Sequence, residues 1–219
     1  MTGVLRFYIF NNKLKKILRQ GWLDVKISSE RIESIAEHIY GCLILAISIN
    51  EEFKLKLNME HILKMLTLHE LEEIVMGDLS ALSKVTKEEK KVMGQKAVKK
   101  ITKGLINQEE IESLLNEFNE RMTKEAKFAY HIDKLEADFQ AKMYDLEGKF
   151  NIEDEIKDCK AWCGESANDI ILNAKCASDI WLDVDKYLYE NDELFASIQS
   201  AIKDITKEDY DSILEELDD

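Results

Sequence analysis

A histidine and three carboxylates fall within five consecutive residues of an otherwise apolar stretch, His69-Glu70-Leu71-Glu72-Glu73. Glu73 is four residues after His69 and three after Glu70, so on a helix these three side chains can converge on one side. Charged side chains are rarely buried unless they are paired or bind a metal. The stretch therefore predicts either part of a divalent-metal site or a solvated acidic helix face, and the spacing alone leaves both interpretations open.

A metal site needs ligands from other parts of the chain, because no single helix face closes a coordination sphere. His38 and Asp133 are the candidates, since each lies in an apolar helical pattern where an unpaired polar group is costly. His131 is two residues from Asp133 and points to nearly the opposite side of a helix, so it cannot share that role. A divalent ion held in this way can polarise a phosphate and activate water, while a nearby carboxylate takes the proton.

Two helices must position His38 and the stretch 69–73. Apolar residues at helical spacing predict the first helix over about 30–50, with Ser29 as its N-terminal cap. Its apolar stripe consists of Ile32, Ile35, Ile39, Cys42, Leu43 and Ala46. The second helix is expected over 59–76, with Asn58 as its cap and Gly77 as its stop.

Composition indicates an all-α protein, because proline is absent and the 219 residues include only 8 glycines. Further helices are expected over 4–19 ending at Gly21, from Lys84 to Lys103 with a solvated basic face, and over 108–121 and 123–145. Gly148 is the expected boundary between a domain at 1–148 and an acidic helical extension at 149–219 that packs on it.

Charge and termini limit the partners and the location. The 30 Lys and Arg against 44 Asp and Glu give a formal net charge of −14, which disfavours nucleic acid and anionic membranes as partners. No stretch approaches the roughly 20 apolar residues of a membrane span, and the N-terminus lacks the long apolar segment of a signal peptide. The 4 cysteines form no CxxC pair. We therefore expect a cytoplasmic protein that binds neither nucleic acid nor a membrane.

The order of the candidate residues resembles a known family. His38 in a first helix, the doublet His69-Glu70 on a later helix and the distant Asp133 resemble the H…HD…D pattern of the HD-domain phosphohydrolases. The surrounding segments resemble the small subgroup that contains 5'-deoxynucleotidases, as does Trp22 upstream of the first histidine. These segments are 33–38 (Glu-Ser-Ile-Ala-Glu-His), 69–73 (His-Glu-Leu-Glu-Glu), 77–79 (Gly-Asp-Leu) and 132–137 (Ile-Asp-Lys-Leu-Glu-Ala).

The resemblance implies an all-helical bundle around one divalent ion, with an additional C-terminal helical segment. It implies His38, His69, Glu70 and Asp133 as the metal ligands, and the ion as Mn, Co, Fe, Ni, Zn or Mg. It also implies a homodimer. The expected substrate is a nucleoside monophosphate, which the enzyme hydrolyses as a metal-dependent phosphomonoesterase.

The resemblance also implies roles for residues around the metal. Glu73 matches the carboxylate that positions or deprotonates the attacking water, and Asp78 matches a second acidic residue on the substrate side. Trp22 is expected either to stack on the substrate or to cap the core.

Two positions depart from the family pattern. The doublet acid is Glu70 instead of aspartate, and Gly21 replaces the basic residue next to the tryptophan. Lys26 is expected to contact the phosphate instead, with Arg19 and Arg31 as alternatives.

Three other interpretations of the whole sequence stay open. They are an HD enzyme acting on phosphodiesters or nucleoside triphosphates, a degenerate HD module that binds metal or nucleotide without turnover, and a purely structural helical protein.

Overall fold

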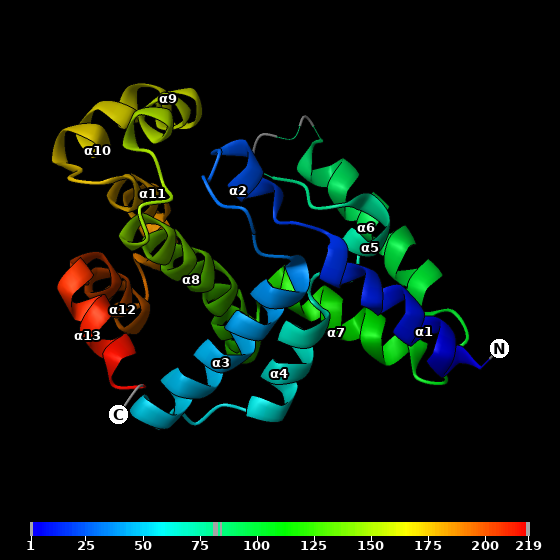
Figure 1. Cartoon of the computed structure of the whole chain (residues 1–219). Helices are drawn as coiled ribbons and strands as arrows, with labels where there is room; N and C mark the ends of the chain where they lie inside the picture. The colour runs from blue at the N-terminus through cyan, green and yellow to red at the C-terminus, as the bar shows by residue number, and fades with distance from the viewer. Residues whose placement is uncertain (1, 81–82, 84, 218–219) are drawn as a thin grey trace. The chain divides into compact units, whose positions relative to one another are not determined.

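The computed structural model describes residues 2–80, 83 and 85–217, which form helices joined by turns and short extended segments, without a β-strand (Figure 1). The α-helices are α1 Gly3–Asn11, α2 Gln20–Asp24, α3 Ile35–Phe53, α4 Met59–Leu68, α5 Glu73–Met76, α6 Lys87–Thr102, α7 Gln108–Glu120, α8 Lys124–Leu146, α9 Ile152–Cys163, α10 Ala167–Asn173, α11 Ala177–Asp185, α12 Glu193–Asp204 and α13 Lys207–Glu215. Short 3-10 helices are η1 Asn12–Lys16, η2 Gly164–Ser166 and η3 Lys186–Tyr189.

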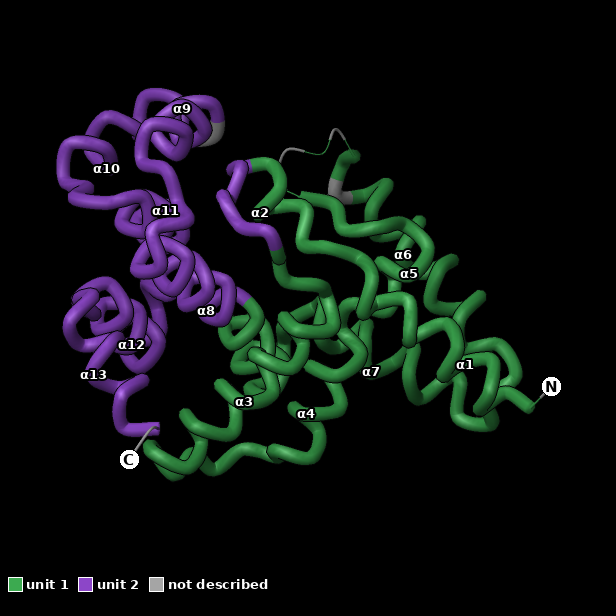
Figure 2. The backbone as a smooth tube through the Cα atoms, in the orientation of Figure 1, with its two compact units in different colours: residues 1–24, 31–133 green, residues 25–30, 134–219 purple. Residues whose placement is uncertain are grey.

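The chain divides into two compact units, which Figure 2 shows in different colours. Unit 1 comprises Met1–Asp24 and Arg31–Asp133, and unit 2 comprises Val25–Glu30 and Lys134–Asp219. This division falls inside α8, whereas Gly148 follows the end of that helix. The assignment of domains to 1–148 and 149–219 stays a prediction.

Helix α3 begins at Ile35, five residues later than predicted, and its cap is Ser34 instead of Ser29. Ser34 and Glu37 form a reciprocal capping box, in which the Glu37 carboxylate accepts from the Ser34 backbone N–H at 2.8 Å. The residues before it are extended and pair with an earlier segment: the Arg19 N–H donates to the Glu33 carbonyl, and the Ile35 N–H to the Ile17 carbonyl. This long-range pairing delays the helix, because it uses backbone groups that an earlier helix start would need.

The predicted helix over 59–76 is correct at both ends and wrong in the middle. The Asn58 side chain caps α4, and Gly77 ends α5 with a φ of 74°. Between them the helix breaks after Leu68. The His69 ring donates from Nδ1 to the Leu66 carbonyl at 2.7 Å and so occupies the acceptor that the next helical turn needs.

Several smaller expectations are corrected by the structure. The segment expected as one helix over 4–19 forms α1 and η1 and then becomes extended, and Gly21 lies within α2 instead of ending a helix. The lysine-rich helix is α6, capped by Thr86, and Lys84 lies outside the described residues. The other two predicted helices agree closely with α7 and α8.

The core of unit 1 fixes α3 and the 69–76 segment relative to each other. Its buried side chains come from η1, α3, the 69–76 segment, α6 and α7, and they are Leu14, Ile35, Ile39, Leu71, Ile74, Val98, Ile101 and Leu115. Burying an aliphatic side chain of this size contributes about 1.5–3 kcal/mol. The predicted stripe of α3 is confirmed for Ile35, Ile39, Cys42 and Ala46, which are all buried.

Unit 2 contains a buried acid that provides a test of stability. Glu155 on α9 is fully buried, and within the described part of the chain neither of its carboxylate oxygens has a hydrogen-bond partner. Burial is the main cause that raises the pKa of Glu155 from 4.5 to about 8, and the negative charge of Asp158 adds to the increase. Between these two values the unfolded chain loses this proton while the folded chain keeps it. The free energy of unfolding should therefore fall as the pH rises through this window.

Glu155→Gln is expected to remove this pH dependence. The variant should match the wild type at pH near 4.5 and exceed its free energy of unfolding at pH near 8 by on the order of a few kcal/mol. Denaturant unfolding of both proteins at the two pH values measures this difference. A difference that does not change with pH would contradict the explanation.

Among the residues that the structure describes, no helix combines the length and the apolar character needed to cross a bilayer.

Candidate functional site

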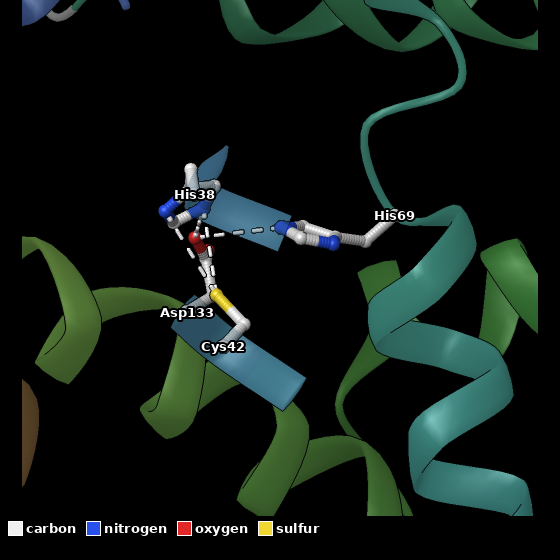
Figure 3. Close-up of side chains that lie close together, drawn as sticks. All are labelled: His38, Cys42, His69 and Asp133. Carbon is white, nitrogen blue, oxygen red and sulfur yellow. Dashed lines mark hydrogen bonds and ion pairs between the residues drawn. The ribbon is translucent and has the colours of Figure 1, made fainter. Parts of the chain in front are cut away.

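Three buried side chains from three helices of unit 1 meet at one point. His38 comes from the first turn of α3, His69 from the end of α4 and Asp133 from α8. Asp133 Oδ1 lies 3.1 Å from His38 Nε2 and 3.7 Å from His69 Nε2. Figure 3 shows the ring of His69 pointing toward the Asp133 carboxylate and His38. The structure thus brings together residues separated by up to 95 positions in the sequence.

Glu70 joins this group from the break between α4 and α5. Its Oε1 lies 3.4 Å from His69 Nε2 and 3.8 Å from His38 Nε2. The Arg19 guanidinium is 3.7 Å from the same oxygen. Burial disfavours the charged form of Glu70, but the neighbouring side chains of His69, His38 and Arg19 favour the carboxylate and hold its pKa below the usual value.

The hydrogen bonding of His69 indicates that this group suits a cation. Because a carbonyl only accepts, the bond from Nδ1 to Leu66 places a proton on Nδ1, so the neutral ring carries its lone pair on Nε2. Nε2 is buried and has no hydrogen-bond partner among the described residues, yet it faces oxygens of Glu70 and Asp133. A nitrogen lone pair that faces carboxylates is unfavourable unless a positive charge lies between them.

The separations between the histidine nitrogens and the carboxylate oxygens also fit a shared ion. Ligands held at bond lengths of about 2.1 Å lie about 3.0–4.2 Å apart, depending on the angle between them. The measured separations between histidine nitrogens and carboxylate oxygens run from 3.1 to 3.8 Å. The residues present therefore fit a divalent metal.

Glu73 lies beside this group at the first position of α5. It is 3% exposed, and its Oε2 has no hydrogen-bond partner among the described residues. Burial is the main cause that raises the pKa of Glu73 to about 11, and the negative charges of Glu70 and Asp78 add to the increase. Asp78 itself is held by the backbone N–H of Gln20, which donates to Oδ2 at 2.6 Å. A cation among these acids would oppose this rise in the pKa of Glu73.

The HD domain family matches residues 11–169 of the chain, which include all of the residues just described. The chain belongs to the HD domain family. The prediction from the order of its histidines and acids is confirmed.

Relatives of this HD domain include named enzymes. A 5'-deoxynucleotidase of Schizosaccharomyces pombe is 34% identical over 194 residues, which cover 86% of this chain and 90% of the relative. A 5'-deoxynucleotidase of Mus musculus is 31% identical over 151 residues, which cover 68% of this chain and 73% of the relative.

Solved structures share the fold of this HD domain. A conserved hypothetical protein from Pyrococcus furiosus matches with a TM-score of 0.65 at 22% identity, over 92% of this chain and 99% of that protein. A protein from Magnetospirillum magnetotacticum, titled a predicted metal-dependent phosphohydrolase, matches with a TM-score of 0.63 at 22% identity, over 92% of this chain and 90% of that protein. The prediction of an all-α HD-type bundle with further C-terminal helices is therefore confirmed.

The two residues that the sequence suggested for substrate binding lie in different surroundings. Trp22 is 1% exposed, and its Nε1 donates to Glu33 Oε1 at 2.7 Å, so its indole packs in the core of the HD domain. Lys26 belongs to unit 2 and is exposed, and its Nζ lies 3.3 Å from Asp154 Oδ1. Arg19 was predicted as an alternative to Lys26 for binding the phosphate, and its guanidinium contacts Glu70.

Two neighbours of the candidate metal ligands were not among the site residues predicted from the sequence. Glu33 accepts from Trp22 and lies 3.5 Å from Arg19 Nε, so it fixes the guanidinium beside Glu70. Cys42 was expected only as part of the apolar stripe of α3, but its Sγ lies beside the His38 ring. Its position four residues after His38 was the available signal, because this spacing puts both side chains on one helix face.

Proposed function

We propose that this HD domain is a metal-dependent phosphomonoesterase that hydrolyses nucleoside 5'-monophosphates. The observation that carries the proposal is the position of His69 Nε2, which is buried, has no hydrogen-bond partner among the described residues and faces the oxygens of Glu70 and Asp133 with His38 beside them. The names of the relatives support the substrate class, because both are 5'-deoxynucleotidases with 31–34% identity to this chain.

The proposed ligands of the ion are His38, His69, Glu70 and Asp133. A divalent ion supplies positive charge that polarises a phosphate ester and lowers the pKa of water. Imidazole and carboxylate donors of this kind suit Mn, Fe, Co, Ni, Zn or Mg. The carboxylate of Glu70 also contacts Arg19, so its longer side chain links the proposed metal site to a guanidinium.

Glu73 and Asp78 are proposed to act on the reacting groups. Glu73 has one carboxylate oxygen without a hydrogen-bond partner among the described residues, and it lies next to Glu70. Because a cation at the proposed site would oppose the rise in its pKa, Glu73 is proposed to be the group that accepts a proton from attacking water. The hydrogen bond that Asp78 accepts from the backbone N–H of Gln20 holds its carboxylate in position. We propose that this carboxylate orients the substrate.

Arg19 is proposed to bind the substrate phosphate. Its guanidinium is already oriented by Glu33 and Glu70, and a planar guanidinium can bind two phosphate oxygens at once. Lys26 and Trp22 stay as predictions for substrate binding from the sequence. Variants of Arg19 and Lys26 separate the two assignments for the phosphate.

Arg19→Ala is expected to raise KM for a nucleoside monophosphate by about ten- to a hundredfold, because a charge-assisted hydrogen bond contributes about 1.5–3 kcal/mol. Arg19→Lys should recover part of this loss, and Lys26→Ala should change KM by less than about threefold. Steady-state kinetics of the three variants measure these effects. A larger effect of Lys26→Ala than of Arg19→Ala would transfer the role to Lys26.

A substrate screen tests the proposed function. The purified full chain is supplied in turn with each of the six metals and with nucleoside mono-, di- and triphosphates and cyclic dinucleotides, and released phosphate is measured. Phosphate release from monophosphates, dependent on metal, is the expected result. Preferred turnover of triphosphates or diesters would overturn the substrate assignment. Bound metal without any turnover, restored by Glu70→Asp, would instead indicate a binding module.

We further propose that the catalytic domain spans 1–148, that 149–219 is a helical extension, and that the protein is a cytoplasmic homodimer. The exposed apolar residues of α1, Val4, Leu5, Tyr8 and Ile9, support self-association, because burying such a surface is favourable. Light scattering on the full chain would show a dimer mass, and Leu5→Glu with Ile9→Glu should reduce it to that of the monomer.

A further inference from the structure

The thiol of Cys42 lies against the proposed metal ligands. Cys42 is fully buried, one helical turn after His38 on α3. Its Sγ is 3.6 Å from His38 Nε2 and 3.8 Å from His38 Nδ1. One donor atom from each of His38, Cys42, His69 and Asp133 can be chosen so that all four lie within 4.8 Å of one another. Figure 3 shows the sulfur next to the Asp133 carboxylate and the His38 ring.

A second observation points to a ligand at the same place. His69 Nε2 is buried, has no hydrogen-bond partner among the described residues and is directed into this cluster. A thiol is a weak donor and a weak acceptor, so packing a sulfur here gives the carboxylate and the imidazoles little hydrogen-bond energy. A thiolate sulfur, by contrast, is a strong ligand for a divalent ion.

The distances fit a sulfur and a nitrogen bound to one ion. Bond lengths of about 2.3 Å for sulfur and about 2.1 Å for nitrogen place the two atoms about 3.1–3.6 Å apart at angles between octahedral and tetrahedral. The Cys42 Sγ to His38 Nε2 separation of 3.6 Å lies in this range.

We propose that Cys42 is a ligand of the bound ion, in addition to the histidines and carboxylates, and that it biases the site toward thiophilic metals. The inference rests on the metal site of the proposed function. When the ion binds, the S–H bond breaks, a sulfur–metal bond forms and the proton is released to solvent, with no change of oxidation state. A sulfur donor raises the affinity for Zn²⁺, Co²⁺ and Cd²⁺ relative to Mn²⁺ and Mg²⁺.

Spectroscopy of the full chain tests the proposal without relying on activity. X-ray absorption of the Zn²⁺-loaded wild type should show a sulfur scatterer at about 2.3 Å. The Co²⁺-loaded wild type should show a sulfur-to-cobalt charge-transfer band in the near ultraviolet. Cys42→Ser should lose both signals while still binding Co²⁺. Cys159→Ser, which replaces another fully buried cysteine, is the matched control and should keep both.

Measurements of metal affinity provide a second test of Cys42 as a ligand. Cys42→Ser should weaken Cd²⁺ binding by at least about tenfold and Mn²⁺ binding by less than about threefold, because serine is a hard donor. Only nitrogen and oxygen scatterers around zinc in the wild type would overturn the proposal, and this result needs no variant to fold. Metal-dependent phosphatase activity with no sulfur ligand would refute this inference alone, whereas failure of the wild type to bind any of these metals would refute the proposed function as well.

Discussion

Replacing His69 by alanine is expected to abolish stoichiometric metal binding and to lower kcat/KM by about a thousandfold or more. The ring nitrogen that it removes is buried, unbonded among the described residues and directed at the oxygens of Glu70 and Asp133. Without this nitrogen the proposed site lacks a neutral ligand for the ion, so the metal should no longer bind. Loss of the metal removes several kcal/mol of transition-state stabilisation. Asp133→Ala should have the same effect, because Asp133 Oδ1 is near both histidines.

The matched control for His69 lies on the same helix. His61 is on α4, and its Nε2 pairs with Glu117 at 2.8 Å, away from the proposed ligands. His61→Ala should therefore keep one metal per chain and full activity. Elemental analysis, circular dichroism and phosphate release are measured on all three variants. Full metal content and full activity in His69→Ala and Asp133→Ala would show that the metal assignment is wrong.

Glu73→Gln is expected to lower kcat by about 10²- to 10⁴-fold and to leave the metal content unchanged, because general base catalysis contributes about this factor. Glutamine has nearly the same shape but cannot accept the proton. The carboxylate oxygen that it replaces is buried and has no hydrogen-bond partner among the described residues, so the structural cost of the change should be small.

Glu72 provides the control for this second prediction. It is adjacent in the sequence, and its carboxyl group packs close to Gly94 on α6 instead of joining the proposed ligands. Glu72→Gln should keep kcat within about threefold of the wild type. Equal losses in the two variants would indicate a general effect of charge or folding and would remove the case for Glu73 as the base. Loss of metal from Glu73→Gln would instead make Glu73 a ligand.

The helices that carry the site follow from local patterns. The apolar stripe of α3 and the helices α7 and α8 lie close to where the sequence places them. A helix repeats every 3.6 residues, so the spacing of its apolar residues is visible in the sequence. The starts and breaks of helices were less predictable. The pairing of 17–19 with 33–35 delayed α3, and the bond from the His69 ring to Leu66 ended α4.

Side chains whose roles depend on distant neighbours were also hard to assign. Trp22 is a core residue that bonds to Glu33, although its position in the sequence suggested substrate stacking as readily. Arg19 lies beside Glu70 because the extended pairing brings it there. Cys42 has the chemistry of a ligand but the spacing of a core residue, so its position beside His38 became evident only in three dimensions.

The sequence by itself determined the all-helical class and membership of the HD family, because helical periodicity and the order of the histidines and acids are properties of the linear chain. It also singled out His38, His69, Glu70 and Asp133 as one group. Only the tertiary structure decided how these residues meet and which neighbours surround them. Their separations, the orientation of the His69 ring and the places of Arg19 and Cys42 depend on packing between α3, α4 and α8. Contacts between residues so far apart in the chain have no signature in local spacing.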